Sequence, residues 1–245
     1  VQDYKLALIG EVLEDYKAEG LELDFCFDNF YFKKAEIEKN IPLMNEFIAK
    51  VRRLAQEIGA RQGREIPLMA RVHLLERDNL AVGLDIAAWL KAGDLDWVVG
   101  QDGNVLVDPG IQAPWLGELA ADAGAAAYYR PPRRIYDERV GLPSIEMYRA
   151  LGQTLALQGY AGLYLGYMPW PLAEREYQIL RETAYPQAHI RSDKRYLLQP
   201  REGALGEETT TPDRQVPESF VEGETIALDV WVADDIESAR ADGEM

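Results

Sequence analysis

The sequence is poor in the residues that build disulfide frameworks and transition-metal sites. Its 245 residues include a single cysteine, Cys26, and only two histidines, His73 and His189. One cysteine excludes an internal disulfide and a thiolate metal cluster. The sequence also has no H-x-H or H-E-x-x-H pattern, which are common arrangements for zinc. We therefore expect neither a cofactor nor a metal centre.

Positive charge is also scarce, since 26 Lys and Arg residues face 42 Asp and Glu residues, for a net charge of −16. Binding to phosphate backbones or anionic membrane surfaces needs clustered cations, so this balance argues against nucleic acid as a partner. No apolar run approaches the length of a transmembrane helix, so we expect no membrane insertion in this segment. The composition fits an uncharged or cationic small molecule or a glycan.

The sequence begins with Val1 inside a helical pattern, so we expect it to be part of a longer protein. A signal peptide would precede this residue, and its absence here is uninformative. Localisation is therefore open, with an extracellular or periplasmic location compatible with the sequence. No feature of the sequence indicates an oligomeric state.

Helical and strand patterns alternate along most of the chain. Helical spacing occurs at 3–18, 42–62, 85–92, 112–122, 142–157 and 172–182, and strand patterns occur at 20–27, 66–73, 95–99, 124–129 and 159–165. Each pair takes about 30–35 residues, which is typical of parallel strands joined by crossover helices. A (β/α)₈ barrel takes about 250 residues, so these five strands predict roughly the last five units of a TIM barrel.

The alternative fold is a doubly wound open sheet. No G-x-G-x-x-G motif or P-loop follows any of the predicted strands, so a nucleotide-binding version would lack its phosphate cradle. We expect residues 1–185 to form the barrel part and residues 186–223, rich in Pro, Gly, Glu and Thr, to be a linker. Residues 224–245 begin with a period-two pattern and predict the truncated start of a β-sandwich-like, all-β module.

Acidic residues alternate with apolar ones in the first predicted strand. Leu21, Leu23, Phe25 and Phe27 alternate with Glu22, Asp24, Cys26 and Asp28. Glu22 and Asp24 therefore project from one face, about 6.5–7 Å apart at Cα. Two acids this close in a partly dry site cannot both ionise freely, so we expect one pKa to rise. In the simpler alternative the acids are solvated, or Glu22 forms a structural ion pair with Arg71.

Two segments carry a family resemblance. The strand and loop at 20–32 resemble the D-G-I-x-(L/F)-D-(D/F) strand-four motif of bacterial family-10-like glycosyl hydrolases, and residues 83–97 are similar to their phrase G-L-D-x-x-x-W-x-x-x-G-L-x-D. The resemblance covers most of residues 1–232 and implies a TIM-barrel carbohydrate enzyme, often followed by a β-sandwich. Asp24 matches the Asp of the strand motif.

The sequence departs from related patterns at three places. Glu19 stands before Gly20, where the family usually has Asp. Well-characterised barrel glycosidases have a nucleophilic Glu after strand seven, whereas residues 128–130 here are Tyr, Tyr and Arg, with no acid before Asp137. Cys26 stands where a chitinase-like signature would have an acid. The two-carboxylate mechanism of glycosidases is therefore only partly represented.

Asp24 is the first candidate catalytic residue, as a general acid or as a nucleophile that stabilises an oxocarbenium-like transition state. Glu22, deeper in the strand, would tune the pKa of Asp24 or bind Arg71. Asp28 would bind a sugar hydroxyl or act as a second carboxylate, although a loop acid is usually solvated. His73 lies on the same strand face as Arg71 and would be a proton shuttle or hydroxyl ligand, or else a packed residue.

The remaining candidates lie where later strands end. Gln101, Tyr128, Arg130 and Trp170 would bind substrate, because aromatic faces stack on sugar rings and polar groups hold hydroxyls; the same aromatics could equally be core residues. Asp102 and Asp108 could join the acids of the first strand as oxygen ligands for Ca²⁺ or Mg²⁺, but no EF-hand spacing supports this.

The sequence therefore predicts a glycoside hydrolase that acts on a polysaccharide or oligosaccharide by carboxylate chemistry. The alternative is a non-catalytic carbohydrate-binding barrel that keeps the cleft and lacks one acid. A metal-dependent barrel hydrolase or lyase is a third class and would need more ligands at the strand ends. The sequence does not indicate which sugar or glycosidic linkage is recognised, nor whether cleavage would retain or invert the anomeric configuration.

Overall fold

The structure is a computed structural model. It describes residues 1–28, 30–101, 107, 109–111, 113–132, 141–166, 171–197, 222–223, 225 and 227–236.

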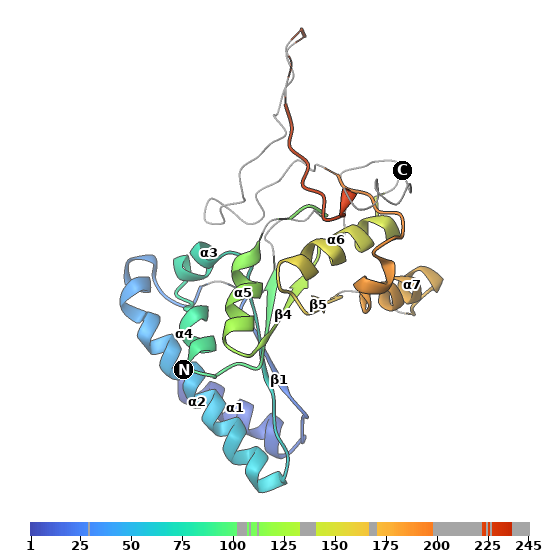
Figure 1. Cartoon of the computed structure of the whole chain (residues 1–245). Helices are drawn as coiled ribbons and strands as arrows, with labels where there is room; N and C mark the ends of the chain where they lie inside the picture. Colours follow the sequence, from blue (N-terminus) through green and yellow to red (C-terminus); the bar gives the residue numbers. More distant parts are fainter. Residues whose placement is uncertain are drawn as a thin grey trace.

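Five parallel strands form one sheet at the centre of the molecule (Figure 1). They are β1 (Leu21–Asp24), β2 (Leu68–His73), β3 (Trp97–Gln101), β4 (Ala126–Arg130) and β5 (Gly162–Leu163), and they lie in the order β1-β2-β3-β4-β5. Each strand therefore pairs with its neighbours in the sequence, in parallel register throughout. The predicted α/β class and parallel sheet are confirmed.

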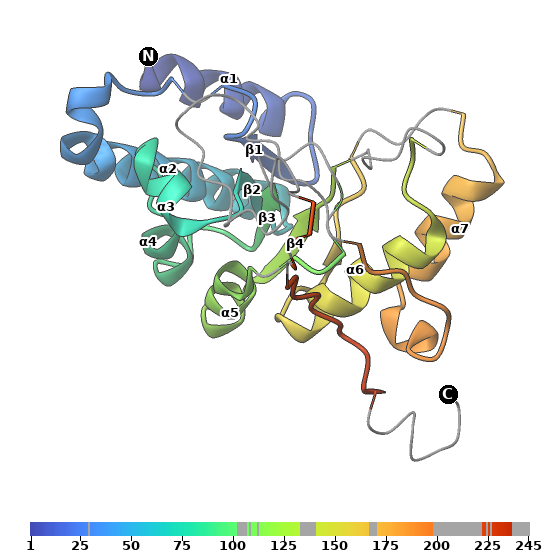
Figure 2. The same ribbon diagram turned by 90° about the horizontal axis from the view of Figure 1, so that it is seen from above.

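Helices connect the strands and cover one face of the sheet. They are α1 (Gln2–Glu14), α2 (Ile37–Gln62), α3 (Glu76–Ala81), α4 (Ile86–Lys91), α5 (Pro114–Asp122), α6 (Ile145–Leu157) and α7 (Glu174–Thr183), with short 3₁₀ turns η1 (Lys34–Glu36) and η2 (Pro186–His189). Figure 2 shows α1, α2, α4, α5 and α6 following one another around the outside of the strands. No described helix is long and apolar enough to cross a lipid bilayer.

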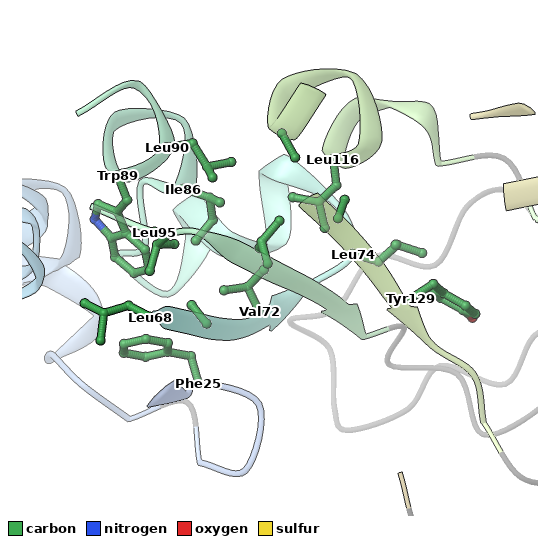
Figure 3. Packing of buried hydrophobic residues seen from close by; sticks show 14 of the residues in the cluster. Phe25, Leu68, Val72, Leu74, Ile86, Trp89, Leu90, Leu95, Leu116 and Tyr129 are labelled. Carbon is green, nitrogen blue, oxygen red and sulfur yellow. The ribbon is translucent and has the colours of Figure 1, made fainter. Parts of the chain in front are cut away.

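The hydrophobic core lies between this face and the helices. Alternate strand residues such as Leu68, Ala70 and Val72 are fully buried there. Figure 3 shows how they pack with residues of α4, among them Trp89, whose indole N–H donates to Asn45 Oδ1 at 2.7 Å. Each fully buried large side chain stabilises the fold by about 1.5–3 kcal/mol. Since strand side chains alternate, the residues between them lie on the opposite face.

Local sequence signals fixed several boundaries correctly. The helix predicted to stop before Gly63 does so, with Gly63 in the left-handed region at φ 68°. The helix predicted at 85–92 corresponds to α4, which Asp85 caps by accepting a hydrogen bond from Ala88 N at 3.0 Å. The start of the helix predicted at 42–62 was wrong, because α2 begins at Ile37 and contains Pro42. Ile37, the first residue of α2, lies near Gly83, with its Cγ2 3.5 Å from a Cβ built on that glycine.

Helix α3 was not predicted at all. It has six residues, too few for a 3.6-residue periodicity to show. Asn79 holds it to the end of β2, because its side chain accepts from His73 N at 3.0 Å and donates to His73 O at 2.7 Å. These two hydrogen bonds, which span six residues, hold the turn between β2 and α3.

The C-terminal part differs from the prediction. In the described residues of the segment predicted as a strand, 225 and 227–232, there is no strand. The residues just after it bind to the chain near residue 195 instead: Tyr196 Oη accepts from Ala233 N at 3.2 Å and Lys194 pairs with Asp234 at 2.7 Å. A strand without a partner cannot satisfy its ladder hydrogen bonds. The all-β module and the domain boundaries stay predictions.

The first residues of the predicted linker contact α6. Residues 186–197 pack against α6, where Arg195 N donates to Glu146 O at 3.1 Å and Arg149 Nη1 donates to Asp193 O at 3.3 Å. Residues 198–221 of the predicted linker lie outside the described residues.

Candidate functional site

The face of the sheet opposite the helices carries a cluster of polar side chains. The register places Asp24 beside Arg71, and the same row continues through Val99 to Tyr128. We call the polar residues of this side the carboxylate face; they are Glu22, Asp24, Arg71, Tyr128, Arg130 and Tyr164. Sequence reasoning proposed all of them except Tyr164. Asp24 and Arg130 are the last residues of β1 and β4, so this part of the face lies at the carboxyl ends of the strands, where β/α proteins usually place their chemistry.

Arg71 joins both candidate acids. Its Nη2 donates to Asp24 Oδ2 at 2.5 Å and its Nε lies 3.2 Å from Glu22 Oε1. The Arg71 side chain is 15% exposed, against 26% for Glu22 and 33% for Asp24. Within the described residues, neither Arg71 Nε nor Glu22 Oε1 has a partner in hydrogen-bond geometry, so that contact is an ion pair. The predicted Glu22–Arg71 contact is confirmed, and Asp24 shares the same guanidinium.

The second oxygen of Asp24 holds the backbone after the strand. Asp24 Oδ1 accepts from Cys26 N at 2.8 Å, a local bond that turns the chain out of the sheet. The strand therefore ends at Asp24 instead of continuing to residue 27 as predicted. Phe25 remains buried, but Phe27 is 87% exposed and does not extend the apolar row.

Tyr164 completes the surroundings of Glu22 from the far edge of the sheet. Its hydroxyl donates to Glu22 Oε2 at 2.9 Å, and the Arg71 guanidinium lies 5.7 Å from its ring centroid. Burial, followed by the hydrogen bond to Glu22, raises the pKa of Tyr164, so the hydroxyl keeps its proton. Sequence reasoning missed this residue, although alternation in the predicted strand 159–165 places Tyr164 and Leu163 on opposite faces of the sheet.

Arg130 reaches the same cluster from β4. A Cβ placed on Gly166 would lie 3.0 Å from Arg130 Nε and 3.2 Å from Tyr164 Cε1, so glycine leaves room for both side chains. The charge of Arg130 acts to lower the pKa of Tyr164, against the larger effect of burial. Tyr128 lies beside β5, with its ring 3.8 Å from a Cβ built on Gly162. The structure thus brings Arg130 and Tyr128 to the predicted face.

His73 and Gln101 end neighbouring strands in register with each other. His73 is buried, and burial lowers its pKa, with Asp78 of α3 acting in the opposite direction. The acid that acts on this histidine is therefore Asp78 rather than Asp24. Gln101 O accepts from Leu74 N at 3.0 Å. The predicted substrate contacts of both side chains stay predictions.

The loop candidates have different outcomes. Asp28 is exposed, and its charge contributes to the raised pKa of Tyr31, after burial and the effects of Cys26 and Asp24. Trp170 lies outside the described residues, as do Asp102 and Asp108. Within the part of the chain that the structure describes, no group of three or more His, Cys, Asp or Glu residues is arranged to hold a metal ion.

The Cys26 thiol lies near Asp24 and Glu22 but has low reactivity. Burial, and then the charge of Asp24, raises its pKa to about 12. The thiolate is the reactive form of cysteine, so this side chain is not a nucleophile near neutral pH.

A cavity of about 700 Å³ lies at the other end of the strands, between α2 and the start of β3. Arg52 and Asp96, which line it, pair at 2.9 Å, and Asp96 Oδ2 accepts from Leu68 N at 2.7 Å. These contacts fasten strand beginnings to α2. Because parallel β/α sheets bind ligands beyond the carboxyl ends of their strands, we assign chemistry to the carboxylate face and not to this cavity.

The contacts limit what each acid can do. Both oxygens of Asp24 accept from donors within the protein, and both oxygens of Glu22 face a donor. A carboxyl group that donates a proton must carry it on one of these oxygens. The arrangement therefore suits a nucleophile or an electrostatic stabiliser. Two acids and two arginines also leave the face without net formal charge, which suits an uncharged polyhydroxyl ligand.

Comparison with known proteins adds no family to this geometry. No protein-family model matches the sequence, and no curated protein matches it.

Proposed function

We propose that this chain supplies five consecutive units of a (β/α)₈ barrel that acts on carbohydrate, with the carboxylate face as its site. The strand order supports the barrel, because a doubly wound sheet reverses its order at a switch point and these five strands run in sequence. The helices follow one another around one side of the sheet, as in a barrel wall (Figure 2). Three further strands would close it.

The proposed reaction is hydrolysis of a glycosidic bond, with Asp24 as nucleophile or stabiliser of the oxocarbenium-like transition state. The observation that carries this role is the fixed position of Asp24 at the carboxyl end of β1, with one oxygen on Arg71 and the other on Cys26 N. Such preorganised contacts hold a carboxylate in one orientation before substrate arrives. Glu22 accepts from Tyr164 and pairs with Arg71, and through this ion pair it would hold the guanidinium of Arg71 beside Asp24.

The contacts of the two acids also support a second candidate function, in which the protein binds a glycan without cleaving it. Glycoside hydrolysis also requires a proton donor, and the contacts of Glu22 and Asp24 place both as acceptors. A barrel that binds glycan through the same face would need no such donor. The two functions share the ligand and differ in whether a bond breaks.

The test uses the full-length protein and Asp24→Asn, which keeps the size of the side chain and removes its charge. Release of reducing ends is measured over a panel of xylan, hydroxyethylcellulose, galactomannan and soluble starch. We expect the variant to lose at least about 100-fold in kcat/KM, as is usual when a group acting on the transition state is removed. The matched control is Glu182→Gln, since Glu182 also pairs with a 15%-exposed arginine, Arg149, but between two helices.

Each outcome decides a point. Equal activity of the wild type and Asp24→Asn would remove Asp24 from the mechanism. An inert wild type that a glycan protects against thermal unfolding would establish the binding function; a ligand at 100 times its Kd stabilises by about 2.7 kcal/mol. An inert wild type that no glycan protects would reject both.

A further inference from the structure

The loop after β1 is pinned at its base. Tyr31 Oη donates to Phe25 O at 2.9 Å, and the two rings meet edge to face with centroids 5.6 Å apart. Phe25 in turn packs on Trp89 of α4, 5.4 Å between centroids, within the core (Figure 3). Because Cys26 N also binds the Asp24 carboxylate, the loop leaves directly from the candidate site. Its two ends are fixed by buried contacts.

Between these anchors the loop presents two phenylalanines to solvent. Phe27 and Phe30 are each 87% exposed. Burying a side chain of this size is worth about 1.5–3 kcal/mol, so the fold gains nothing from having phenylalanine at either position. A single exposed apolar residue needs no explanation. Two rings within four residues, on a loop anchored beside Asp24, are instead typical of a surface that meets a ligand.

We propose that Phe27 and Phe30 form an aromatic platform that binds the apolar ring faces of an uncharged polysaccharide at the rim of the carboxylate face. The inference rests on the proposed carbohydrate function and adds a binding subsite to it. Aromatic rings offer large, rigid apolar area with two rotatable bonds, so little entropy is lost on contact. The adjoining acids and arginines supply hydrogen-bonding groups for the hydroxyls around each sugar ring.

Charge favours an uncharged polysaccharide over an anionic lipid surface. The chain carries a net charge of −16, which repels anionic headgroups. Asp28, which lies between the two phenylalanines in the sequence, is exposed. A neutral polyhydroxyl chain meets neither the repulsion from the net charge nor that from Asp28.

The experiment is affinity gel electrophoresis of the full-length protein in gels that contain hydroxyethylcellulose, xylan or galactomannan. The test variant is Phe27→Ala/Phe30→Ala. The matched control is Tyr4→Ala/Tyr16→Ala, since these aromatics are 66% and 74% exposed and belong to α1 and the turn after it. We expect at least one polysaccharide to retard the wild type, the phenylalanine variant to bind at least tenfold more weakly, and the tyrosine variant to match the wild type.

The same gels separate this proposal from the catalytic one. Asp24→Asn should still be retarded through its intact phenylalanines, even where it has lost activity. Retardation of an inert wild type that needs both phenylalanines would keep the platform and reject hydrolysis. An active wild type whose retardation is unchanged in the phenylalanine variant would reject the platform and keep hydrolysis.

Three further results would overturn the platform. The first is the absence of retardation by every polysaccharide. The second is a fall in Tm of several degrees in the phenylalanine variant but not in the tyrosine variant, because the rings would then be buried against another part of the protein. The third is sedimentation of the wild type, but not of the phenylalanine variant, with phosphatidylcholine vesicles, which would make the tip a membrane contact.

Discussion

Two arginines of this protein are equally buried and differ in what they hold. Arg149 of α6 and Arg71 of β2 are both 15% exposed. Arg149 donates to Glu182 of α7 at 2.6 Å and to Asp193 O, so it ties together three segments. Arg71 instead faces two acids of a single neighbouring strand, Glu22 and Asp24. The first arrangement fastens elements; the second fixes the position of side chains.

The partners of the two arginines sharpen this difference. The hydrogen bond from Arg149, and then one from Gln178, lowers the pKa of Glu182. That acid is therefore bound by groups from two helices and exposes only 13% of its side chain. Asp24 is 33% exposed at a strand end, where a ligand could reach it. An arginine–carboxylate pair thus joins two helices at Glu182, whereas at Asp24 it leaves a carboxylate that a ligand could reach.

Removal of Arg71 should have the largest effect on stability. In Arg71→Met the two acids of β1 lose their shared cation, and the partly buried charges repel one another. Loss of one partner from a fully buried pair costs about 3–5 kcal/mol, and partial exposure here reduces that to about 1–3 kcal/mol. Urea unfolding measures the change. Adding Glu22→Gln and Asp24→Asn to the variant should restore most of the loss.

The matched control is Arg61→Met, since Arg61 pairs with Glu14 in an ion pair that is about half exposed. Exposed pairs contribute about 0–1 kcal/mol. Equal losses in the two variants would show that Arg71 is no more than another surface ion pair.

The Arg149–Glu182 pair should reveal itself through pH. In the folded protein the pKa of the Glu182 carboxyl is lowered. The stabilisation by this pair is therefore present above the unfolded-state pKa of about 4.3 and is lost as the pH falls through the folded-state pKa. Glu182→Gln should therefore cost about 1–2 kcal/mol at pH 7. The gap between wild type and variant should shrink in urea unfolding below about pH 4.3. A gap that stays constant down to pH 3 would contradict the linkage.

Tyr164→Phe should give the smallest effect. The variant keeps the ring beneath Arg71 and loses only the hydroxyl that donates to Glu22, a bond worth about 0.5–1.5 kcal/mol. If Glu22 positions Arg71 for catalysis, kcat should fall while KM stays near its wild-type value. Tyr160→Phe is the control, because that hydroxyl also binds one acceptor, Ala113 O, but within the core. A change in stability alone, equal in both variants, would make Tyr164 purely structural.

Residue types that favour helix ends could be read from the sequence, whereas contacts that depend on the folded chain could not. Gly63 follows the end of α2 and Asp85 caps α4, because each acts on backbone a few residues away. The helix predicted from residue 42 begins at Ile37, so Pro42 lies inside it and did not mark its start. The end of β1 depended on the carboxylate of Asp24 binding a backbone N–H two residues on, which alternation alone does not encode.

The candidate site was predictable to the same extent. Glu22, Asp24 and Arg71 follow from alternation in two adjacent strands, and the structure brings them together. Tyr164 lies 142 residues from Glu22 in sequence, so only the folded sheet could identify it as a partner. The buried environment of His73 depends on α3, a helix too short to show a pattern.

The buried thiol beside Asp24 makes the strand end observable without a mutation. Cys26 is the single cysteine of these 245 residues, so a thiol label on this chain reports on this place alone. Its pKa of about 12 and its burial mean that a reagent reacts only when the loop after β1 opens. The rate of thiol labelling therefore measures how often the loop after β1 opens. A glycan bound to this loop would lower the labelling rate.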